Sequence, residues 1–448
     1  MLKKILAGIG ILILLVIAYV FYTNYPKLEV VSSYAAKKVC SCTFISDRTQ
    51  ESIEAEDLAR SPLGIASSTI DRENKRVTTS VFGMHKKVAE YRENLGCVLI
   101  QGKDDFNVHF PSTTIQYNNP DSLPFPYGDQ IIDAQMDNVD YEKLKAAADG
   151  YFDENGAMTE KKTRAILVLH KDTLLYERYA QGYDKDTEML GWSMTKSIMN
   201  AHVGMRVLDG AVSIEDDNLF PEWADDERKS ITLENLLHMA SGLEWDEVYA
   251  EVSPATKMLF AAEDIVKAAK SSPLEYEPGE HWEYSSGTSN LIAGYLRSTF
   301  DNDEDHYLYP YQRIFGPLNM KSAVMETDEA GNYIGSSYCY ATARDWARFG
   351  TLYLHDGVWN GQRLLPEGWV DFTKTPVPAS EGVYGAHFWT NANGSYSKDA
   401  PSDLYSMNGF EGQRVFIIPS KDLIIVRLGL SENLDLYKLA GEISKAIQ

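Results

Sequence analysis

Cysteine is scarce in this sequence, which has four among its 448 residues: Cys40, Cys42, Cys97 and Cys339. So few thiols exclude a small fold that depends on a scaffold of disulfides. An oxidising compartment still permits one bridge. Cys40 and Cys97 lie in short runs typical of strands, so we expect Cys97 to pair across a small sheet with Cys40 or with its neighbour Cys42.

Positive charge is also in short supply, with 42 Lys and Arg against 65 Asp and Glu and a formal net charge of −23. Binding to a phosphate backbone needs clustered cations, so we expect no nucleic-acid partner. The nine histidines form no H-E-x-x-H motif. The C-x-C of residues 40–42 has no second Cys or His pair at the spacing of a zinc site. We therefore expect no metal and no cofactor.

One long apolar run is present near the N-terminus. Lys3 and Lys4 precede it at residues 5–22, and no further charge occurs before Lys27. About eighteen helical residues at a rise of about 1.5 Å nearly cross a bilayer core. The run is followed by TNYPK rather than by a small-residue cleavage site, which favours an uncleaved anchor over a signal peptide. We expect residues 1–26 to form a cytoplasmic N-terminus and membrane helix, which leaves the remaining chain on the outer, periplasmic or extracellular side.

Three further regions follow the apolar run. Residues 27–110 alternate short β-like runs and include a hairpin around residues 76–94. Residues 111–135 are rich in proline and predict a linker that wraps the next domain. Residues 136–448 form that domain, with two strands before a long helical block and three strands after it. Because neither group of strands makes a stable core alone, we expect an α+β fold. One antiparallel sheet is built from both ends, flanked by helices, and the helical block is an inserted lobe.

The stretch GWSMTKSIMN at residues 191–200 holds the first candidate motif. Apolar residues recur at helical spacing from Met194 to Leu208, so Ser193 lies at the N-terminus of a helix. Free N–H groups and the helix dipole stabilise negative charge there. Residues i and i+3 share a face, so Lys196 can reach the Ser193 hydroxyl. A second S-x-x-K, Ser395–Lys398, lies among Gly, Asp and Pro and predicts a loop.

Two later stretches strengthen this interpretation. Tyr284 stands just before a helix that begins near residues 286–289, after a turn at Pro278–Gly279. The segment MNGFEGQRVFIIP at residues 407–419 opens a strong strand with glycine-rich positions. Glycine there permits a ligand to approach the strand edge closely, although a bulge or turn explains it equally well.

In this order, the three stretches resemble the class C β-lactamase and DD-peptidase superfamily of serine hydrolases. Class A relatives use S-x-x-K, S-D-N and K-T-G, whereas class C uses S-x-x-K, Y-x-N, and K-T-G or H-x-G. The counterparts here are Ser193–Lys196, Tyr284–Ser286 and Met407–Gly409. Residues 231–243, 314–320 and 341–350 also look like that branch, and the resemblance covers about residues 140–448. The N-terminal portion and the FPYGD at residues 125–129 are more like 6-aminohexanoate-oligomer hydrolases and family VIII-type carboxylesterases.

The resemblance implies that Ser193 attacks an ester or amide carbonyl while Lys196 and Tyr284 share the proton transfers. Water then hydrolyses the acyl-enzyme. The backbone N–H groups of Ser193 and Phe410 would form the oxyanion hole, where one donor is worth about 10²–10³ in rate in other enzymes. The residues expected to contact the substrate are Ser286, Met407, Gly409 and Phe410.

Two positions depart from the family pattern: Ser286 stands where Asn is usual, and Met407 where Lys or His is. Those polar groups help to hold the amide and carboxylate of penicillin-like substrates, so we expect no penicillin recognition unless Arg414 or His387 substitutes. The sequence predicts a membrane-anchored serine hydrolase of a small-molecule ester or amide. The alternatives are a penicillin-binding DD-peptidase or β-lactamase-type enzyme, and a catalytically idle binding protein on the same fold.

Overall fold

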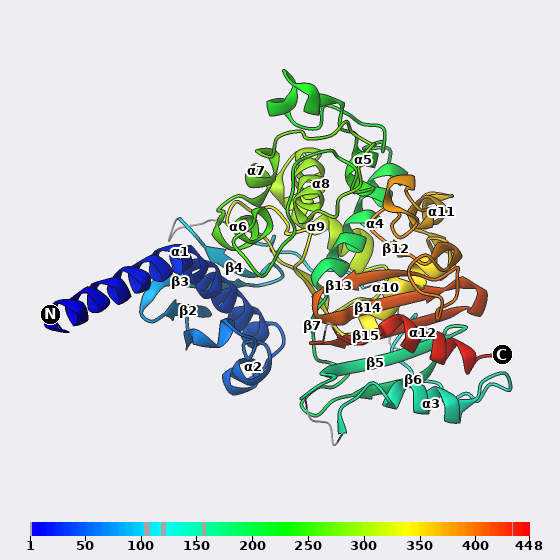
Figure 1. The fold of residues 1–448 in the computed structure, drawn as a ribbon. Coiled ribbons are helices and arrows are strands. Elements are labelled where there is room, and N and C mark those ends of the chain that lie inside the picture. The colour runs from blue at the N-terminus through cyan, green and yellow to red at the C-terminus, as the bar shows by residue number, and fades with distance from the viewer. Residues whose placement is uncertain (1, 103–107, 118–121, 155–157, 432) are drawn as a thin grey trace.

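The computed structural model describes residues 2–102, 108–117, 122–154, 158–431 and 433–448. Residues 103–107 and 118–121, which belong to the predicted N-terminal region and linker, lie outside these ranges. Figure 1 shows a long N-terminal helix with a small sheet beside it, a larger sheet below, and a helical lobe above.

The N-terminal helix α1 (Leu2–Phe44) continues without a break across the domain boundary expected at residues 26 and 27. Residues 27–44, expected in a β-rich region, are therefore helical. Val31, Ala35 and Val39 recur at the spacing of one helix face and are all buried. A short apolar run does not by itself distinguish a strand from a buried helix, and tertiary packing decided the matter here.

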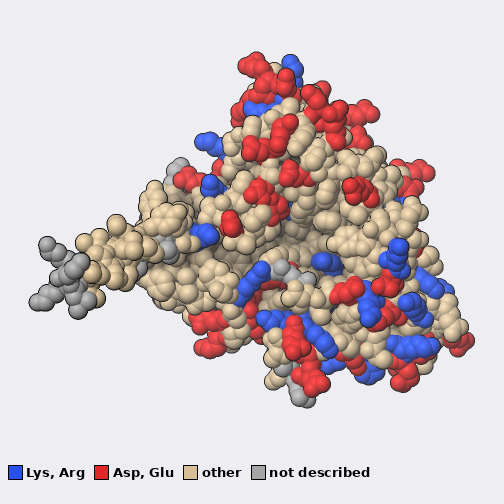
Figure 2. Space-filling view, in the orientation of Figure 1, with Lys and Arg blue, Asp and Glu red and all other residues tan. Residues whose placement is uncertain are grey.

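The first half of α1 projects from the body (Figure 1). Its described side chains are apolar and exposed, among them Ile5, Leu12 and Tyr22. In Figure 2 it shows no Lys, Arg, Asp or Glu between its grey tip and the body. Within the described residues, no helix has the length and apolar character needed to cross a membrane. The membrane helix predicted at residues 5–22 thus lacks support, and this run is the first part of the longer α1.

The small sheet beside α1 is antiparallel, with strand order β1–β2–β3–β4. The predicted hairpin is the β2–β3 pair. A disulfide joins Cys40 on α1 to Cys97 on β4, so one of the two predicted pairings is confirmed, although Cys40 lies in a helix and not in a strand. The elements are α2 (Gln50–Glu56), β1 (Ala66–Asp71), β2 (Arg76–Val81), β3 (Met84–Arg92) and β4 (Gly96–Ile100).

The larger sheet is built from both ends of the main domain, as predicted, with antiparallel strands in the order β12–β13–β14–β15–β5–β6. Strands β5 and β15 are buried along their whole length, and helix α10 (Ala343–Leu354) packs on them and on β14. Helices α3 (Tyr141–Asp149) and α12 (Leu436–Lys445) pack together. The strands are β5 (Thr163–His170), β6 (Thr173–Tyr179), β12 (Trp389–Thr390), β13 (Tyr405–Gly409), β14 (Gln413–Ile418) and β15 (Leu423–Gly429).

The segment between β6 and β12 forms the inserted, mainly helical lobe. It also contains two small sheets, β7–β9–β8 and β10–β11. The helices of this segment are α4 (Thr195–Leu208), α5 (Leu233–Leu237), α6 (Pro254–Ala261), α7 (Ile265–Lys270), α8 (Ser286–Ser298), α9 (Asp303–Pro310), α10 and α11 (Trp369–Lys374). Of these, α10 packs on the larger sheet, so the helical block predicted as one inserted lobe also supplies a helix that covers the sheet. The strands of this segment are β7 (Met189–Leu190), β8 (Val324–Met325), β9 (Cys339–Ala341), β10 (Val358–Trp359) and β11 (Gln362–Arg363).

Candidate active site

Ser193 lies in a short 3₁₀ turn, Trp192–Met194, between β7 and α4. Trp192 has φ = 49°, in the left-handed region that residues with a side chain rarely adopt. Gly191 leaves no room for a side chain, because a Cβ there would lie 2.3 Å from the Trp346 ring. At Gly409 a Cβ would lie 2.1 Å from the Gly191 carbonyl oxygen. The end of β13 therefore packs directly on the loop that presents Ser193, which explains the glycine of the third motif.

Lys196 occupies the first turn of α4 and is 1% exposed. Its Nζ lies 3.1 Å from Ser193 Oγ, 3.1 Å from Ser286 Oγ and 2.9 Å from the backbone oxygen of Ser336. The predicted i, i+3 contact between the motif's serine and lysine is therefore present in the structure.

The hydrogen bonds around Lys196 determine which group faces the lone pair of its neutral amine. The Ser336 carbonyl can only accept, and the Ser286 hydroxyl donates its own hydrogen to Glu247, so it too accepts from Lys196. A neutral amine has two N–H groups and one lone pair. With both N–H groups used in this way, the lone pair faces Ser193 Oγ and can take its proton.

Burial lowers the pKa of Lys196 to about 8, while the negative charge of Glu247 acts in the opposite direction. Glu247 is held by the backbone N–H of Ser286 at 2.9 Å and by the hydroxyl of Tyr249 at 2.6 Å. A lysine becomes an effective base when its charged form is desolvated, and this is the condition that Lys196 meets. Sequence analysis missed Glu247, because its segment matches no motif.

Tyr284 immediately precedes Ser285, the residue that caps the N-terminus of α8. The Lys196 Nζ lies 4.8 Å from the centre of the Tyr284 ring. Burial raises the pKa of Tyr284 above its usual value and the charge of Glu247 raises it further, whereas a hydrogen bond with Ser193 lowers it. The phenol stays protonated at neutral pH and can act as a proton donor beside Ser193.

The residues predicted to contact the substrate lie in different environments. Ser286 is fully buried and bonded to Lys196 and Glu247, so it belongs to the proton network. Met407 is fully buried on β13, opposite Val415. Phe410 follows Gly409 at the end of β13 and makes an edge contact with Trp192, with ring centres 5.6 Å apart. Of these residues, Phe410 lies at the cavity beside Ser193.

The two residues named as substitutes for the third motif's cation differ in position. His387 lies beneath α4, where its Nδ1 is 2.9 Å from the Lys196 backbone oxygen, and burial lowers its pKa to about 3. It is therefore neutral. Arg414 donates hydrogen bonds to the backbone oxygens of Gly409 and Gln413, at 2.9 and 2.7 Å, and so links the two ends of the β13–β14 connection. Among the described residues no carboxylate pairs with Arg414, and its charge is close enough to lower the pKa of Tyr284.

The second S-x-x-K is an exposed loop, as predicted. Ser395 is exposed and its hydroxyl donates to the Gly382 backbone oxygen at 2.7 Å. Ser395 is therefore a natural control for Ser193. In the part of the chain that the structure describes, no three His, Cys, Asp or Glu side chains gather as a metal would require.

A serine whose proton can pass to a desolvated lysine, in a fold with this split sheet and inserted lobe, marks the chain as a serine hydrolase. The chain belongs to the Beta-lactamase family, whose model matches residues 148–432.

Individual relatives agree with this assignment. The 6-aminohexanoate-dimer hydrolase of Paenarthrobacter ureafaciens is 24% identical over 312 residues, which cover 64% of this chain and 77% of the relative. A suggested 6-aminohexanoate-dimer hydrolase from Bacillus anthracis has a TM-score of 0.57 at 22% identity, over 74% of this chain and 88% of that one. A penicillin-binding protein homologue from Caulobacter crescentus has a TM-score of 0.54 at 15% identity, over 70% of this chain and 99% of that one. The two solved structures demonstrate a shared fold.

Proposed function

We propose that this chain hydrolyses an ester or amide bond of a small molecule through an acyl-enzyme on Ser193. The observation that carries the proposal is the Lys196 amine, which is desolvated, lies 3.1 Å from Ser193 Oγ and has an acceptor for each of the two N–H groups of its neutral form. A catalytically idle binding protein would have no need to keep a buried lysine in this arrangement, since burying an amine costs free energy.

In the proposed cycle, Ser193 Oγ bonds to the carbonyl carbon as its proton passes to Lys196. The N–H groups of Ser193 and Phe410 hold the oxyanion. Tyr284 gives its proton to the leaving group as the C–O or C–N bond breaks, and regains one from Lys196. Water then attacks the acyl-enzyme by the same proton path, which releases the acid and restores Ser193.

A labelling experiment tests the nucleophile. Wild-type protein, Ser193→Ala and Ser395→Ala are treated with a fluorophosphonate, and intact mass and peptide mapping locate the adduct. We expect one adduct on Ser193 in wild type and Ser395→Ala, and neither adduct nor hydrolysis in Ser193→Ala. Labelling that survives Ser193→Ala would refute the mechanism.

We propose that the preferred substrates are neutral esters and uncharged amides, not penicillins or D-Ala-D-Ala peptides. A carboxylate beside the scissile bond needs a cation or several donors, and Met407 provides neither. The expected kcat/KM is at least tenfold higher for p-nitrophenyl butyrate than for a chromogenic cephalosporin. A 6-aminohexanoate dimer belongs in the same assay because of the Paenarthrobacter relative. Rapid cephalosporin turnover by wild type would indicate instead that Arg414 supplies the positive charge.

We also propose that α1 attaches the protein to the cytoplasmic membrane, with the hydrolase domain on its outer side. The exposed apolar side chains of the projecting part of α1 support attachment. The Cys40–Cys97 disulfide supports an oxidising compartment. Carbonate extraction of membranes should retain the full chain and release a variant without residues 2–22. Protease added outside spheroplasts should digest the catalytic domain; protection of that domain would reverse the orientation.

A further inference from the structure

A cavity of about 210 Å³ opens beside Ser193, between the hydrolase domain and α1. The N-terminal helix supplies one wall through Val30, Val31 and Tyr34. The hydrolase domain supplies Trp192, Ser193 and Phe410. The active-site cavity is therefore completed by a segment that lies outside the residues matched by the family model, 148–432.

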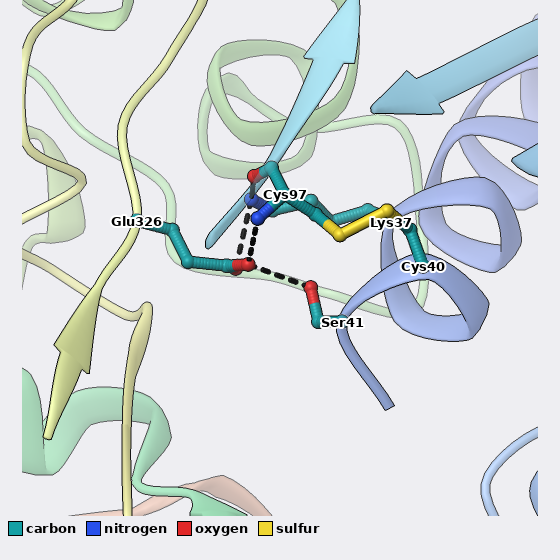
Figure 3. The surroundings of a disulfide bond; sticks show 5 residues. All are labelled: Lys37, Cys40, Ser41, Cys97 and Glu326. Atoms are coloured by element: carbon teal, nitrogen blue, oxygen red, sulfur yellow. Dashed lines mark hydrogen bonds and ion pairs between the residues drawn. A yellow bond between two sulfur atoms is a disulfide. The ribbon is translucent and has the colours of Figure 1, made fainter. Parts of the chain in front are cut away.

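The wall from α1 is fixed in place by buried contacts. Figure 3 shows Lys37 and Ser41 of α1 reaching Glu326 of the hydrolase domain, beside the Cys40–Cys97 disulfide. Lys37 pairs with Glu326 at 2.8 Å, and the Ser41 hydroxyl donates to Glu326 at 2.7 Å. Both ionic side chains are at most 3% exposed. Separating a buried ion pair costs free energy, so the contact with Glu326 holds α1 against the hydrolase domain.

Ring contacts fix the same wall at the nucleophile. Tyr34 stacks on Trp192, the residue before Ser193, with ring centres 6.1 Å apart. Tyr34 also makes an edge contact with Phe260, at 5.5 Å. A change in the position of α1 would therefore alter the space directly beside Ser193 Oγ.

The chemistry of the lining favours an apolar group. Val30, Val31, Leu63 and Phe260 present hydrocarbon surface to the cavity. The buried carboxylate Glu411 also lines it and accepts from the Trp192 indole N–H at 3.1 Å. Two cations, Lys27 and Arg60, and a second carboxylate, Glu251, also line the cavity, so its preference for an apolar group rests on the hydrocarbon surface and not on its charge. A cavity of about 150 Å³ accepts benzene in another protein, so this one has room for an aromatic ring or a medium-length alkyl chain.

The position of Tyr284 indicates which side of the scissile bond enters the cavity. Ser193 and Phe410, the proposed oxyanion donors, are among the described residues that line it, and Tyr284 is not. Tyr284 is the proposed proton donor to the leaving group, so the leaving group lies toward Tyr284 and the acyl group toward the cavity. We propose that the cavity is an acyl-chain site partly formed by α1, which makes the enzyme selective for esters or amides of medium-length apolar acids. This proposal rests on the hydrolase function proposed above.

The test is a series of p-nitrophenyl esters from acetate to dodecanoate. For wild type, kcat/KM should rise about fourfold per added methylene until the cavity is full, because each buried methylene contributes about that factor. Val30→Trp fills the cavity and should lower the hexanoate-to-acetate ratio of kcat/KM at least tenfold. Val31→Ala enlarges it and should move the optimum to longer chains. Val16→Trp is the matched control: it makes the same substitution as Val30→Trp on an exposed part of α1, and its chain-length profile should match that of wild type.

The outcomes separate this inference from the function on which it rests. Fluorophosphonate labelling of Ser193 shows that each variant has a folded site. If Ser193 is not labelled in Val30→Trp, the chain-length profile of Val31→Ala is used to test the acyl-chain site. An unchanged chain-length profile in labelled variants, or an equal loss for every ester, would overturn the acyl-chain site and leave the hydrolase proposal standing. Absence of both labelling and ester hydrolysis in wild type would overturn the hydrolase proposal itself.

Discussion

Acylation should depend on the protonation of Lys196. Burial lowers the pKa of this lysine to about 8. At pH 7 about 9% of the molecules would then have a neutral amine, against about 0.04% for an unperturbed lysine with a pKa of about 10.4. Desolvation thus increases the available base about 200-fold at pH 7. At pH 9 the neutral fraction reaches about 90%, so the expected gain in kcat/KM between pH 7 and pH 9 is about tenfold.

The assay is kcat/KM for a neutral ester between pH 6.5 and 9.5, with Ser193→Ala as the blank for spontaneous hydrolysis. The midpoint of the rise should lie near pH 8. Tyr284 contributes no second transition in this range, because burial raises its pKa above its usual value. A profile that is flat across this range would refute the assignment of Lys196 as the base.

A substitution of Glu247 tests the direction in which its charge shifts the pKa of Lys196. Its negative charge raises the pKa of Lys196, so Glu247→Gln should lower that pKa and move the midpoint to lower pH. The amide oxygen can still accept from the Ser286 and Tyr249 hydroxyls, whereas the amide NH2 would face the N–H donors of Ser286 and Trp245, so fluorophosphonate labelling of Ser193 is the control for a folded site. A midpoint that moves to higher pH would show that the electrostatic reasoning is wrong.

Two further predictions concern the proton path and the attachment of α1. Lys196→Ala and Tyr284→Phe should each lower kcat by at least about 10²–10⁴, and the double variant should lose little more; multiplicative losses would argue against a shared path. Glu326→Ala leaves Lys37 buried without its partner and should lower the free energy of unfolding in urea by about 3–5 kcal/mol, whereas Lys37→Met with Glu326→Leu should recover most of it. Equal stability of Glu326→Ala and wild type would contradict a structural role for the pair.

The sequence by itself determined the features that depend on local spacing. Period-2 and apolar runs indicated the strands of the split sheet, and the chain order of strands and helices required that both ends share it. The contact between Ser193 and Lys196 was predictable because helix geometry brings residues i and i+3 together. The disulfide could be narrowed to two pairings but not to one, because Cys40 and Cys42 would share one face of the strand expected there, and it is the helix α1 that sets them apart.

Only the tertiary structure decided the features that depend on distant segments. Residues 27–44 have runs that suit a strand, but packing against the small sheet and the lobe selected a helix. The proton network depends on Glu247 and Ser336, which lie 39 residues before and 50 residues after Ser286 in the chain. The lowered pKa of Lys196 follows from burial, which no local pattern encodes. The same holds for the cavity, because one of its walls comes from α1, more than 150 residues before Ser193.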